Sequence, residues 1–368
     1  MSENVLSENT IKAYKLSLEK LKKNGIDIDN LNVEKLMEYF EEKEIPPTTQ
    51  DIIMSAILNY SKSNGKNVHI IEILSKSMKN HREKANINYM RNKLTDKEKE
   101  KYVSWKIILH VYKKLQEIIT IVENTEDAYL DYVILSLYIY HPVRRIDDYL
   151  EMYINDKKEL YNDSSTILWT NSESIKKNDT HYNLRKIIKN GKDQNPNSYK
   201  RLEKESYFVF EKYKTKNHYG KQIIEVETRL DKILRNYIEI NDLKDGDKLF
   251  SLTKSNYISR LSNIFRKIIN KNLSVSMLRH IYITERIKDP KITEYERYLL
   301  SQKMAHSIVM QGKYRKVDYD ETQEKALEEK INTFKPETWN KIITHYGTEE
   351  ERKSAIRKSK MKYQSKNK

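Results

Sequence analysis

Two short strand-like stretches, residues 206–210 (SYFVF) and 222–226 (QIIEV), lie inside a chain whose apolar residues otherwise recur at helical spacing. Residues 213–220 (YKTKNHYG) separate them and end in a glycine, so we expect a β-hairpin there. The spacing on both sides predicts helices near 104–121, 127–140, 228–240, 255–270, 276–288 and 293–303. The sequence therefore predicts a mainly α protein with a small β-hairpin or sheet, in the α+β class.

The N-terminal part reads as a separate helical module. Asn9 or Thr10 can cap a first helix that Asn24-Gly25 ends, and further helices are expected near 33–42, from Thr48 or Thr49, and near 70–78. The apolar period disappears over residues 91–101 (RNKLTDKEKEK), and residues 156–200 are polar enough for an insertion or a long connection. We therefore predict a helical domain over 1–90, a charged linker over 91–101, a second domain over 102–320, and a C-terminal helix with a basic tail over 321–368.

The charge balance points to a polyanionic partner. Lys and Arg number 69 against 54 Asp and Glu, which gives a net charge of +15. Nucleic acid is the partner that this excess of cations most directly suggests, although an unrelated enzyme can also carry a basic, solvated surface.

Several residue types are missing or rare, and this excludes whole classes of site. The chain has no cysteine, which excludes thiol nucleophiles, cysteine-ligated metals and disulfides. Its seven glycines are too widely spaced for a nucleotide-binding loop. The longest apolar run, residues 132–140, is too short to span a membrane, and the first ten residues lack the features of a secretory signal. We expect an intracellular, non-secreted protein with no membrane or nucleotide partner.

Three segments carry the chemistry, in a fixed order along the chain. They are residues 140–149 (YHPVRRIDDY), 276–284 (SMLRHIYIT) and 304–314 (MAHSIVMQGKY), and the lysine-bearing hairpin lies between the first two. This series resembles the tyrosine recombinase or phage-type integrase family over nearly the whole chain. The family pattern is an arginine box (GLRxSEL or PPxRxDY), a hairpin lysine, HxLRH, a GH or AH pair, and a tyrosine eight or nine residues later.

The resemblance carries over residue by residue. Arg145 matches the first box, with Arg144 as the alternative register, and Lys214 matches the hairpin lysine. Arg279 matches the LRH arginine, His306 the AH pair, and Tyr314 the tyrosine. The N-terminal module likewise resembles the family's DNA-binding core-binding domain, which makes residues 102–320 the expected catalytic domain.

The resemblance implies a site-specific enzyme that cuts and rejoins double-stranded DNA through a 3′-phosphotyrosyl intermediate. Tyr314 would be the nucleophile, Lys214 the general acid, and His306 a hydrogen-bond partner of the scissile phosphate. The residue types suit this chemistry, because negative charge grows on the phosphate oxygens in the transition state and the fixed forks of Arg145 and Arg279 can stabilise it. No metal or other cofactor is expected, and the family suggests a tetramer on DNA.

One position departs from the pattern. Ser276 stands where HxLRH has its first histidine, and a hydroxyl cannot act as a base near neutral pH. The group that accepts the Tyr314 proton is therefore open. We expect His280 to pack in the core rather than to replace that histidine.

Other interpretations remain at this point. A type IB topoisomerase or telomere resolvase shares the chemistry, and an inactive DNA-binding protein could share the fold. The acidic cluster Asp147, Asp148 and Glu151 permits a metal-dependent nuclease, but we favour a structural role for Asp148. In the family a C-terminal element docks onto a neighbouring protomer, and residues 321–345, with the apolar residues Ile331, Phe334, Trp339 and Ile343, could do the same here. The composition, rich in Lys, Asn and Ile and poor in Arg, suggests an AT-rich genome. The PPxRxDY-like box suggests a virus or mobile element, which would place the enzyme in a host cell.

Overall fold

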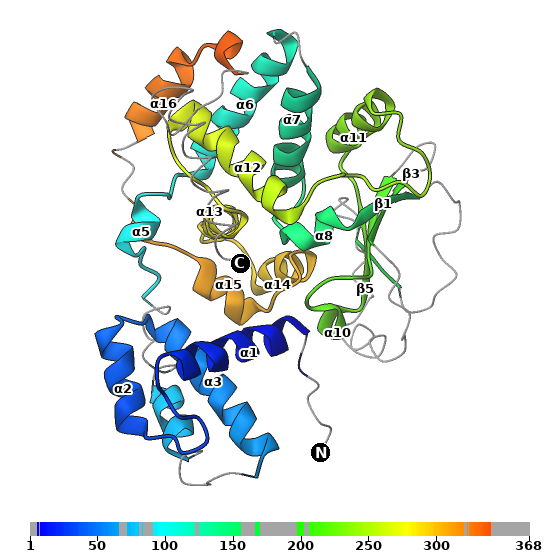
Figure 1. Cartoon of the computed structure of the whole chain (residues 1–368). Coiled ribbons are helices and arrows are strands. Elements are labelled where there is room, and N and C mark those ends of the chain that lie inside the picture. Colours follow the sequence, from blue (N-terminus) through cyan, green and yellow to red (C-terminus); the bar gives the residue numbers. More distant parts are fainter. Residues whose placement is uncertain are drawn as a thin grey trace, which may run out of the picture. The chain divides into compact units, whose positions relative to one another are not determined.

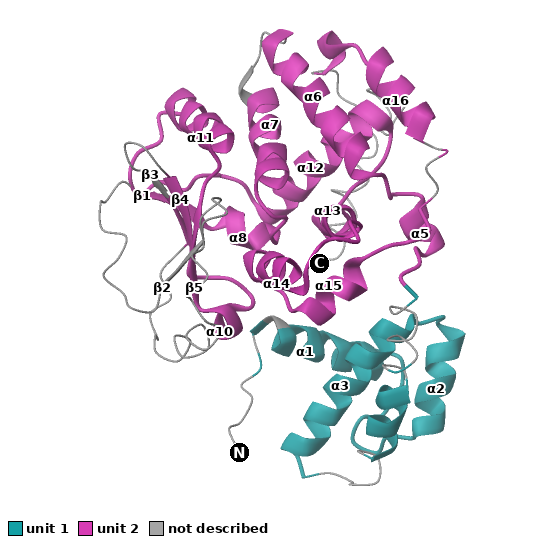
Figure 2. Cartoon of the chain, turned by 180° about the vertical axis from the view of Figure 1, so that it is seen from behind, with its two compact units in different colours: residues 1–91 teal, residues 92–368 magenta. Residues whose placement is uncertain are grey.

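The chain forms two compact units in a computed structural model, residues 1–91 and 92–368 (Figure 2). The structure describes these residues: 6, 8–65, 72–80, 83, 91–121, 125–155, 166–169, 197–201, 206–319, 322 and 324–339.

Unit 1 is helical. It contains α1 (Glu8–Lys23), α2 (Val33–Glu42), α3 (Pro47–Ser63) and a further helical stretch over 72–80. Local signals set the helix ends: the Asn32 side chain accepts from the backbone N–H of Lys35 at the start of α2, and Gly25 follows α1 with a φ of +73°. The apolar faces of these helices share one core, in which Leu36 and Ile57 are fully buried.

Unit 2 contains most of the helices, which surround a second core (Figure 1). The helices are α5 (Asp96–Lys99), α6 (Trp105–Ile121), α7 (Thr125–Tyr140), α8 (Ile146–Leu150), α10 (Lys216–Tyr219), α11 (Thr228–Ile240), α12 (Lys254–Ile269), α13 (Val275–Ile287), α14 (Glu294–Lys303), α15 (Ile308–Tyr314) and α16 (Glu324–Thr333), with a 3₁₀ turn η2 (Pro336–Thr338). Of these helices, α6 and α7 pack against each other, and α7 also contacts α11 and α12.

The predicted hairpin is the centre of a larger mixed sheet. The antiparallel pair is β4 (Ser206–Phe210) and β5 (Lys221–Glu225), and Phe208 faces Ile224 in its register. Three further strands, β1 (Met152–Asn155), β2 (Thr166–Trp169) and β3 (Asn197–Arg201), complete the order β1-β3-β4-β5-β2. The pairs β1–β3 and β2–β5 are parallel, and β3–β4 is antiparallel. The mainly helical α+β class is confirmed.

Two parts of the chain differ from what the sequence suggested. Residues 156–200 were expected to be an insertion or a connection, but they supply β2 and β3; the rest of that stretch lies outside the described residues. The expected linker over 91–101 contains α5, and residues from 92 onward belong to unit 2. Thr95 and Glu98 form a capping box, which gives this charged segment a helix that apolar periodicity could not reveal.

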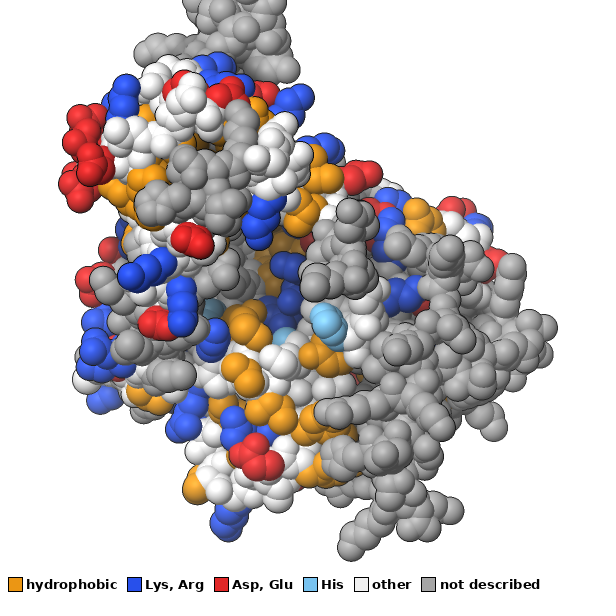
Figure 3. All heavy atoms as spheres, turned by 90° about the horizontal axis from the view of Figure 1, so that it is seen from below, with side chains coloured by type: hydrophobic (Ala, Val, Ile, Leu, Met, Phe, Trp, Pro, Cys, Tyr) orange, Lys and Arg blue, Asp and Glu red, His pale blue; other side chains and the backbone are white. Residues whose placement is uncertain are grey.

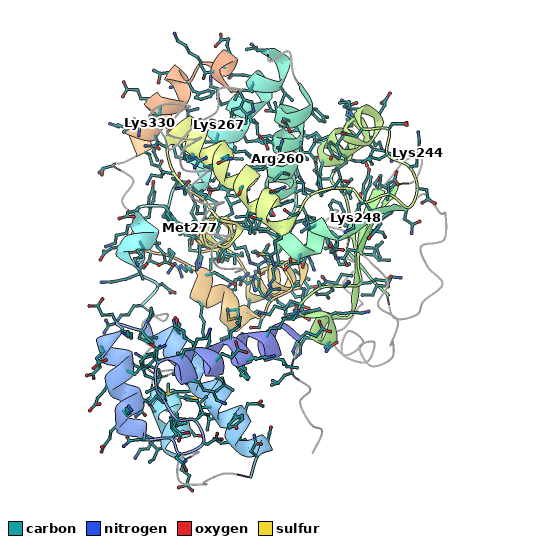
Figure 4. All side chains as sticks on the ribbon, in the orientation of Figure 1. Lys244, Lys248, Arg260, Lys267, Met277 and Lys330 are labelled. Atoms are coloured by element: carbon teal, nitrogen blue, oxygen red, sulfur yellow. The ribbon has the colours of Figure 1, made fainter. Side chains whose placement is uncertain are left out.

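The C-terminal helix α16 packs on its own chain. Leu327 and Ile331 of α16, and Trp339 after η2, are buried in the core of unit 2, where α16 contacts α6 and α12. Lys267 of α12, labelled in Figure 4, donates to the Trp339 carbonyl at 2.7 Å and lies 4.3 Å from the centre of its ring. Ile331 and Trp339, two of the apolar residues considered for docking onto a neighbouring protomer, are thus buried within their own chain, and the docking itself stays a prediction. The basic tail and Ile343 lie outside the described residues.

None of the helices in the described part of the chain combines the length and the apolar character that a membrane crossing requires.

Candidate active site

The turn between α14 and α15 fixes the position of His306. The backbone N–H of Ala305 donates to the Gln302 carbonyl at 2.9 Å, and that of His306 donates to the Ser301 carbonyl at 3.0 Å. This is the Schellman pattern of a helix end, and it places Ala305 in the left-handed region with a φ of +52°. Glycine is the usual residue there, so the turn is strained by its Cβ atom. The side chain of Ser307 then caps α15, whose last residue is Tyr314.

Arg279 connects three parts of the site from the interior of α13. Its Nη1 donates to the Val143 carbonyl at 2.8 Å, and its Nη2 donates to the Met304 carbonyl at 3.4 Å. Met277, labelled in Figure 4, marks the first turn of the same helix. Arg279 is only 3% exposed, and its buried Nε atom has no hydrogen-bond partner among the residues that the structure describes. A buried cation with a free donor is suited to an anionic ligand.

Tyr314 lies against Arg279 and two histidines. The guanidinium carbon of Arg279 is 5.5 Å from the centre of the Tyr314 ring. The His306 ring centre is 5.7 Å away and the His280 ring centre 4.8 Å away. The Nδ1–H of His280 donates to the Tyr314 carbonyl at 2.9 Å, which holds the backbone of the tyrosine. His280 is therefore half-buried beside the site, against the Tyr314 ring, and not in the core where we expected it.

The two neighbouring arginines have different surroundings, which separates the two registers. Arg144 is fully buried: its Nε donates to Asp148 at 2.8 Å, its Nη1 donates to Gln222 and to the Lys303 carbonyl, and its fork lies over the Phe210 ring. Arg145 is only partly buried, and its Nη1 reaches the Ala305 carbonyl at 3.5 Å, next to His306. Arg144 is thus held by buried contacts, although its Nη2 atom finds no partner among the described residues, and Arg145 lies beside the turn that carries His306.

The tip between β4 and β5 is attached to the same turn. The Thr215 hydroxyl donates to the Ala305 carbonyl at 2.9 Å, so the tip and Arg145 share one acceptor. Lys214, the residue before Thr215, is exposed. The tip is more ordered than a simple hairpin turn, because it contains α10 and a hydrogen bond from the Tyr213 hydroxyl to the Gly220 carbonyl.

Ser276 lies in the first turn of α13, one turn before Arg279, and is exposed. The cap of this helix is Ser274, whose side chain accepts from the backbone N–H of Met277. Ser276 is thus available to a ligand, but it does not join the contacts that unite Arg279, His306 and Tyr314.

Burial controls the protonation of the site. His306 is 3% exposed, and this burial, together with the charge of Arg279, lowers its pKa to about 4. Burial also lowers the pKa of His280 and that of Arg279. The Nδ1 atom of His306 lies 3.1 Å from the Ser307 carbonyl and must donate to it. In the neutral ring Nε2 is therefore an acceptor, and no described residue donates a hydrogen bond to this buried atom.

The three carboxylates of the acidic cluster are separately paired. Asp148 bonds Arg144, Asp147 bonds Lys254 at 2.7 Å, and Glu151 lies 3.3 Å from Lys248. Among the residues that the structure describes, no group of three His, Asp or Glu side chains is placed to hold a metal ion. The structural role expected for Asp148 agrees with its buried pairing.

Two supporting residues were not identified from the sequence. Thr215 anchors the tip, and Gln222 bridges Arg144 to the Gln302 carbonyl at 2.9 Å. The only signal for Thr215 was its place next to Lys214. For Gln222, a polar residue in an apolar strand was the available signal.

No protein-family model matches the chain, and a search of curated proteins finds no match.

The contrast between the two arginines predicts opposite effects of substitution. Arg144→Met leaves Asp148 buried and unpaired, so the free energy of unfolding should fall by about 3 to 5 kcal/mol. Arg145→Met, at a partly exposed position, should change it by less than about 1 kcal/mol. Urea unfolding followed by circular dichroism measures both, and equal losses would contradict the assignment.

The low pKa of His306 predicts sensitivity to acid. Between about pH 6.5 and pH 4 the unfolded chain binds a proton that the folded chain does not, so stability decreases as the pH falls through this window. His306→Gln should reduce the loss between pH 7 and pH 5 by about 2 kcal/mol. Urea unfolding at the two pH values tests this; the same loss in both proteins would show that His306 does not titrate as described.

Proposed function

We propose that this protein breaks and rejoins DNA strands as a tyrosine recombinase, with Tyr314 as the nucleophile. The observation that carries the proposal is the meeting of Arg279, His306 and Tyr314 from separate sequence segments, with Arg145 beside them. Two buried atoms in this group, Arg279 Nε and His306 Nε2, have no hydrogen-bond partner in the described part of the chain. A buried polar atom without a partner is unfavourable, and a phosphodiester brings oxygen atoms that Arg279 can bind.

The proposed step is a transesterification. The Tyr314 hydroxyl oxygen forms a bond to phosphorus, the bond from phosphorus to the 5′ oxygen breaks, and that oxygen leaves as a hydroxyl after it gains a proton. The bond energy stays in the 3′-phosphotyrosyl ester, so a 5′ hydroxyl can reverse the step without an energy source. Arg145 and Arg279 would stabilise the charge that grows on the non-bridging oxygens.

His306 is a candidate for the group that accepts the Tyr314 proton, a role that the hydroxyl of Ser276 cannot fill. Because the Nδ1–H of His306 donates to Ser307, its Nε2 can take the proton that Tyr314 loses. The imidazolium formed in this way can then donate to a phosphate oxygen, which agrees with the role implied by the family. The bound phosphate anion would raise the pKa of His306 and make it a stronger base.

The nucleophile would act on DNA held by its own chain, since Tyr314 lies with Arg279 and His306 of the same chain. The net charge of +15 suits double-stranded DNA as the substrate. In Figure 3, Lys and Arg side chains (blue) are interspersed with Asp and Glu side chains (red), and histidine side chains (pale blue) lie next to some of the blue ones near the centre of the view. A tetramer on DNA and a viral or mobile-element role remain part of the proposal.

Covalent trapping tests the nucleophile. We would use a pool of nicked, AT-rich duplexes of randomised sequence, because the short 5′-hydroxyl fragment released at a nick diffuses away and prevents religation. The wild-type chain should form an adduct that survives SDS, and mass spectrometry should find the nucleotide on Tyr314. Tyr314→Phe should form none.

The matched control is Tyr319→Phe. Tyr319 lies five residues further on and packs against Tyr102, with ring centres 4.9 Å apart. This variant should form the adduct like the wild type. An adduct that persists in Tyr314→Phe and disappears in Tyr319→Phe would show that the nucleophile is Tyr319 and not Tyr314.

Relaxation of a supercoiled plasmid by the monomer without site preference would favour a topoisomerase, and tight DNA binding without any adduct would favour an inactive binding protein.

The proposed acid, Lys214, can be tested by changing the leaving group. Lys214→Ala should slow cleavage by about 100-fold or more, because an alkoxide leaves poorly without a proton. Replacing the bridging 5′ oxygen by sulfur should restore the rate to within about tenfold, since a thiol with a pKa near 8.5 leaves as a thiolate. Lys212→Ala removes an exposed lysine from the same tip and should cleave both substrates normally. If sulfur gives no rescue, Lys214 is not the acid.

A further inference from the structure

The segment that follows Tyr314 is attached to the first residues of unit 2. The backbone N–H of Val317 donates to the Asn92 carbonyl at 3.0 Å, and the backbone N–H of Leu94 donates to the Asp318 carboxylate at 2.7 Å. These contacts join residues more than two hundred positions apart in the sequence. They begin at the boundary between the two units, because Asn92 is the first residue of unit 2.

Lys316 is the central residue of this attachment. It is only 7% exposed, and its Nζ donates to the Lys93 carbonyl at 3.1 Å and to Glu98 at 3.3 Å. Its backbone N–H donates to the Thr284 hydroxyl of α13 at 2.9 Å. A buried ammonium is costly unless it is paired and hydrogen-bonded, so Lys316 is stable in this position only while Glu98 remains in place.

Glu98 is itself fixed by the start of α5. Its carboxylate accepts from the backbone N–H of Thr95 at 2.8 Å and from the Thr95 hydroxyl at 3.1 Å. Burial alone would raise the pKa of Glu98, but the hydrogen bonds from Thr95 and the charge of Lys316 hold it below its ordinary value. The carboxylate is thus a fixed anion to which Lys316 can bind.

The attachment lies two residues from the nucleophile. Tyr314 ends α15, its carbonyl is held by His280, and the chain then leaves the helix toward Lys316. In the proposed reaction the Tyr314 hydroxyl must reach the phosphate beside Arg279 and His306. A shift of the segment that follows Tyr314 would therefore misplace the nucleophile. A displacement of about 1 Å is enough to slow a positioned reaction about 100-fold.

We propose that Lys316, held by Glu98, is a positioning residue for Tyr314. This rests on the function proposed above. The interaction fixes the residues just after the nucleophile to the residues just after unit 1, and through them it sets the geometry of attack. Lys316 does not touch the DNA phosphate in this account, and its effect is on the rate of cleavage rather than on DNA binding.

The test compares Lys316→Met and Glu98→Gln with a matched control. Glu98→Gln keeps an oxygen that can accept from Thr95, so α5 is preserved while the charge for Lys316 is lost. Asp96→Asn is the control, since Asp96 lies in the same helix, is exposed, and pairs with the exposed Lys99 at 3.6 Å. Cleavage is measured in single turnover on the nicked duplex pool, with the dissociation constant measured on the same DNA.

At saturating DNA, both Lys316→Met and Glu98→Gln should cleave about 10- to 100-fold more slowly, with the dissociation constant unchanged within twofold. Lys316→Arg, which keeps the charge, should recover most of the rate, and Asp96→Asn should behave as the wild type. Rates within twofold of the wild type in both variants would overturn the proposal. A parallel loss of rate and DNA affinity would also overturn it, because that is the result of a general loss of folded protein.

Amide hydrogen exchange gives a readout that does not need DNA. Residues 315–319 should exchange at least tenfold faster in Glu98→Gln and Lys316→Met than in the wild type and Asp96→Asn. Equal exchange in all four proteins would overturn the attachment. If the wild type forms no DNA adduct but the exchange changes as expected, the proposed function fails while the attachment stands.

Discussion

The hydrogen bonds of the buried Arg279 guanidinium hold the site together. A charge in the protein interior must be paired or hydrogen-bonded, and here two backbone carbonyls, of Val143 and Met304, accept from it. Those carbonyls belong to the segment that carries Arg145 and to the turn that carries His306. One side chain on α13 thus brings together three segments that are far apart in the sequence, and its unpaired Nε remains for a ligand.

The turn at Ala305 is the second constraint, and it shows how local geometry serves the site. The end of α14 requires a left-handed residue, and in that conformation the Ala305 carbonyl accepts from both Arg145 and Thr215. The same two backbone hydrogen bonds that complete the helix end hold His306 in place. A few hydrogen bonds at one helix end therefore position the arginine, the hairpin tip and the histidine together.

Much of the fold could be predicted because apolar spacing reveals packed helices: α2, α6 and α11 lie where the pattern placed them, and the hairpin is β4 with β5. The strands β1, β2 and β3 could not be predicted, because β1 and β2 have only four residues each and β3 (NSYKR) has no apolar run. The ordered motifs identified Arg145, Arg279, His306 and Tyr314, and these four residues lie near one another in the structure. Spacing could not show that Arg144 is buried on Asp148, or that Lys316 is paired with Glu98, since such pairs depend on tertiary contacts.

We propose that Arg279, His306 and Tyr314 form one phosphate site. A crystal structure of the chain with orthovanadate, which mimics the five-coordinate phosphorus of the transition state, would test this claim. We expect vanadate oxygens about 3 Å from Arg279 Nε and from His306 Nε2, with the Tyr314 hydroxyl oxygen in an apical position. Vanadate bound only to surface lysines, with these three side chains free of it, would contradict the claim.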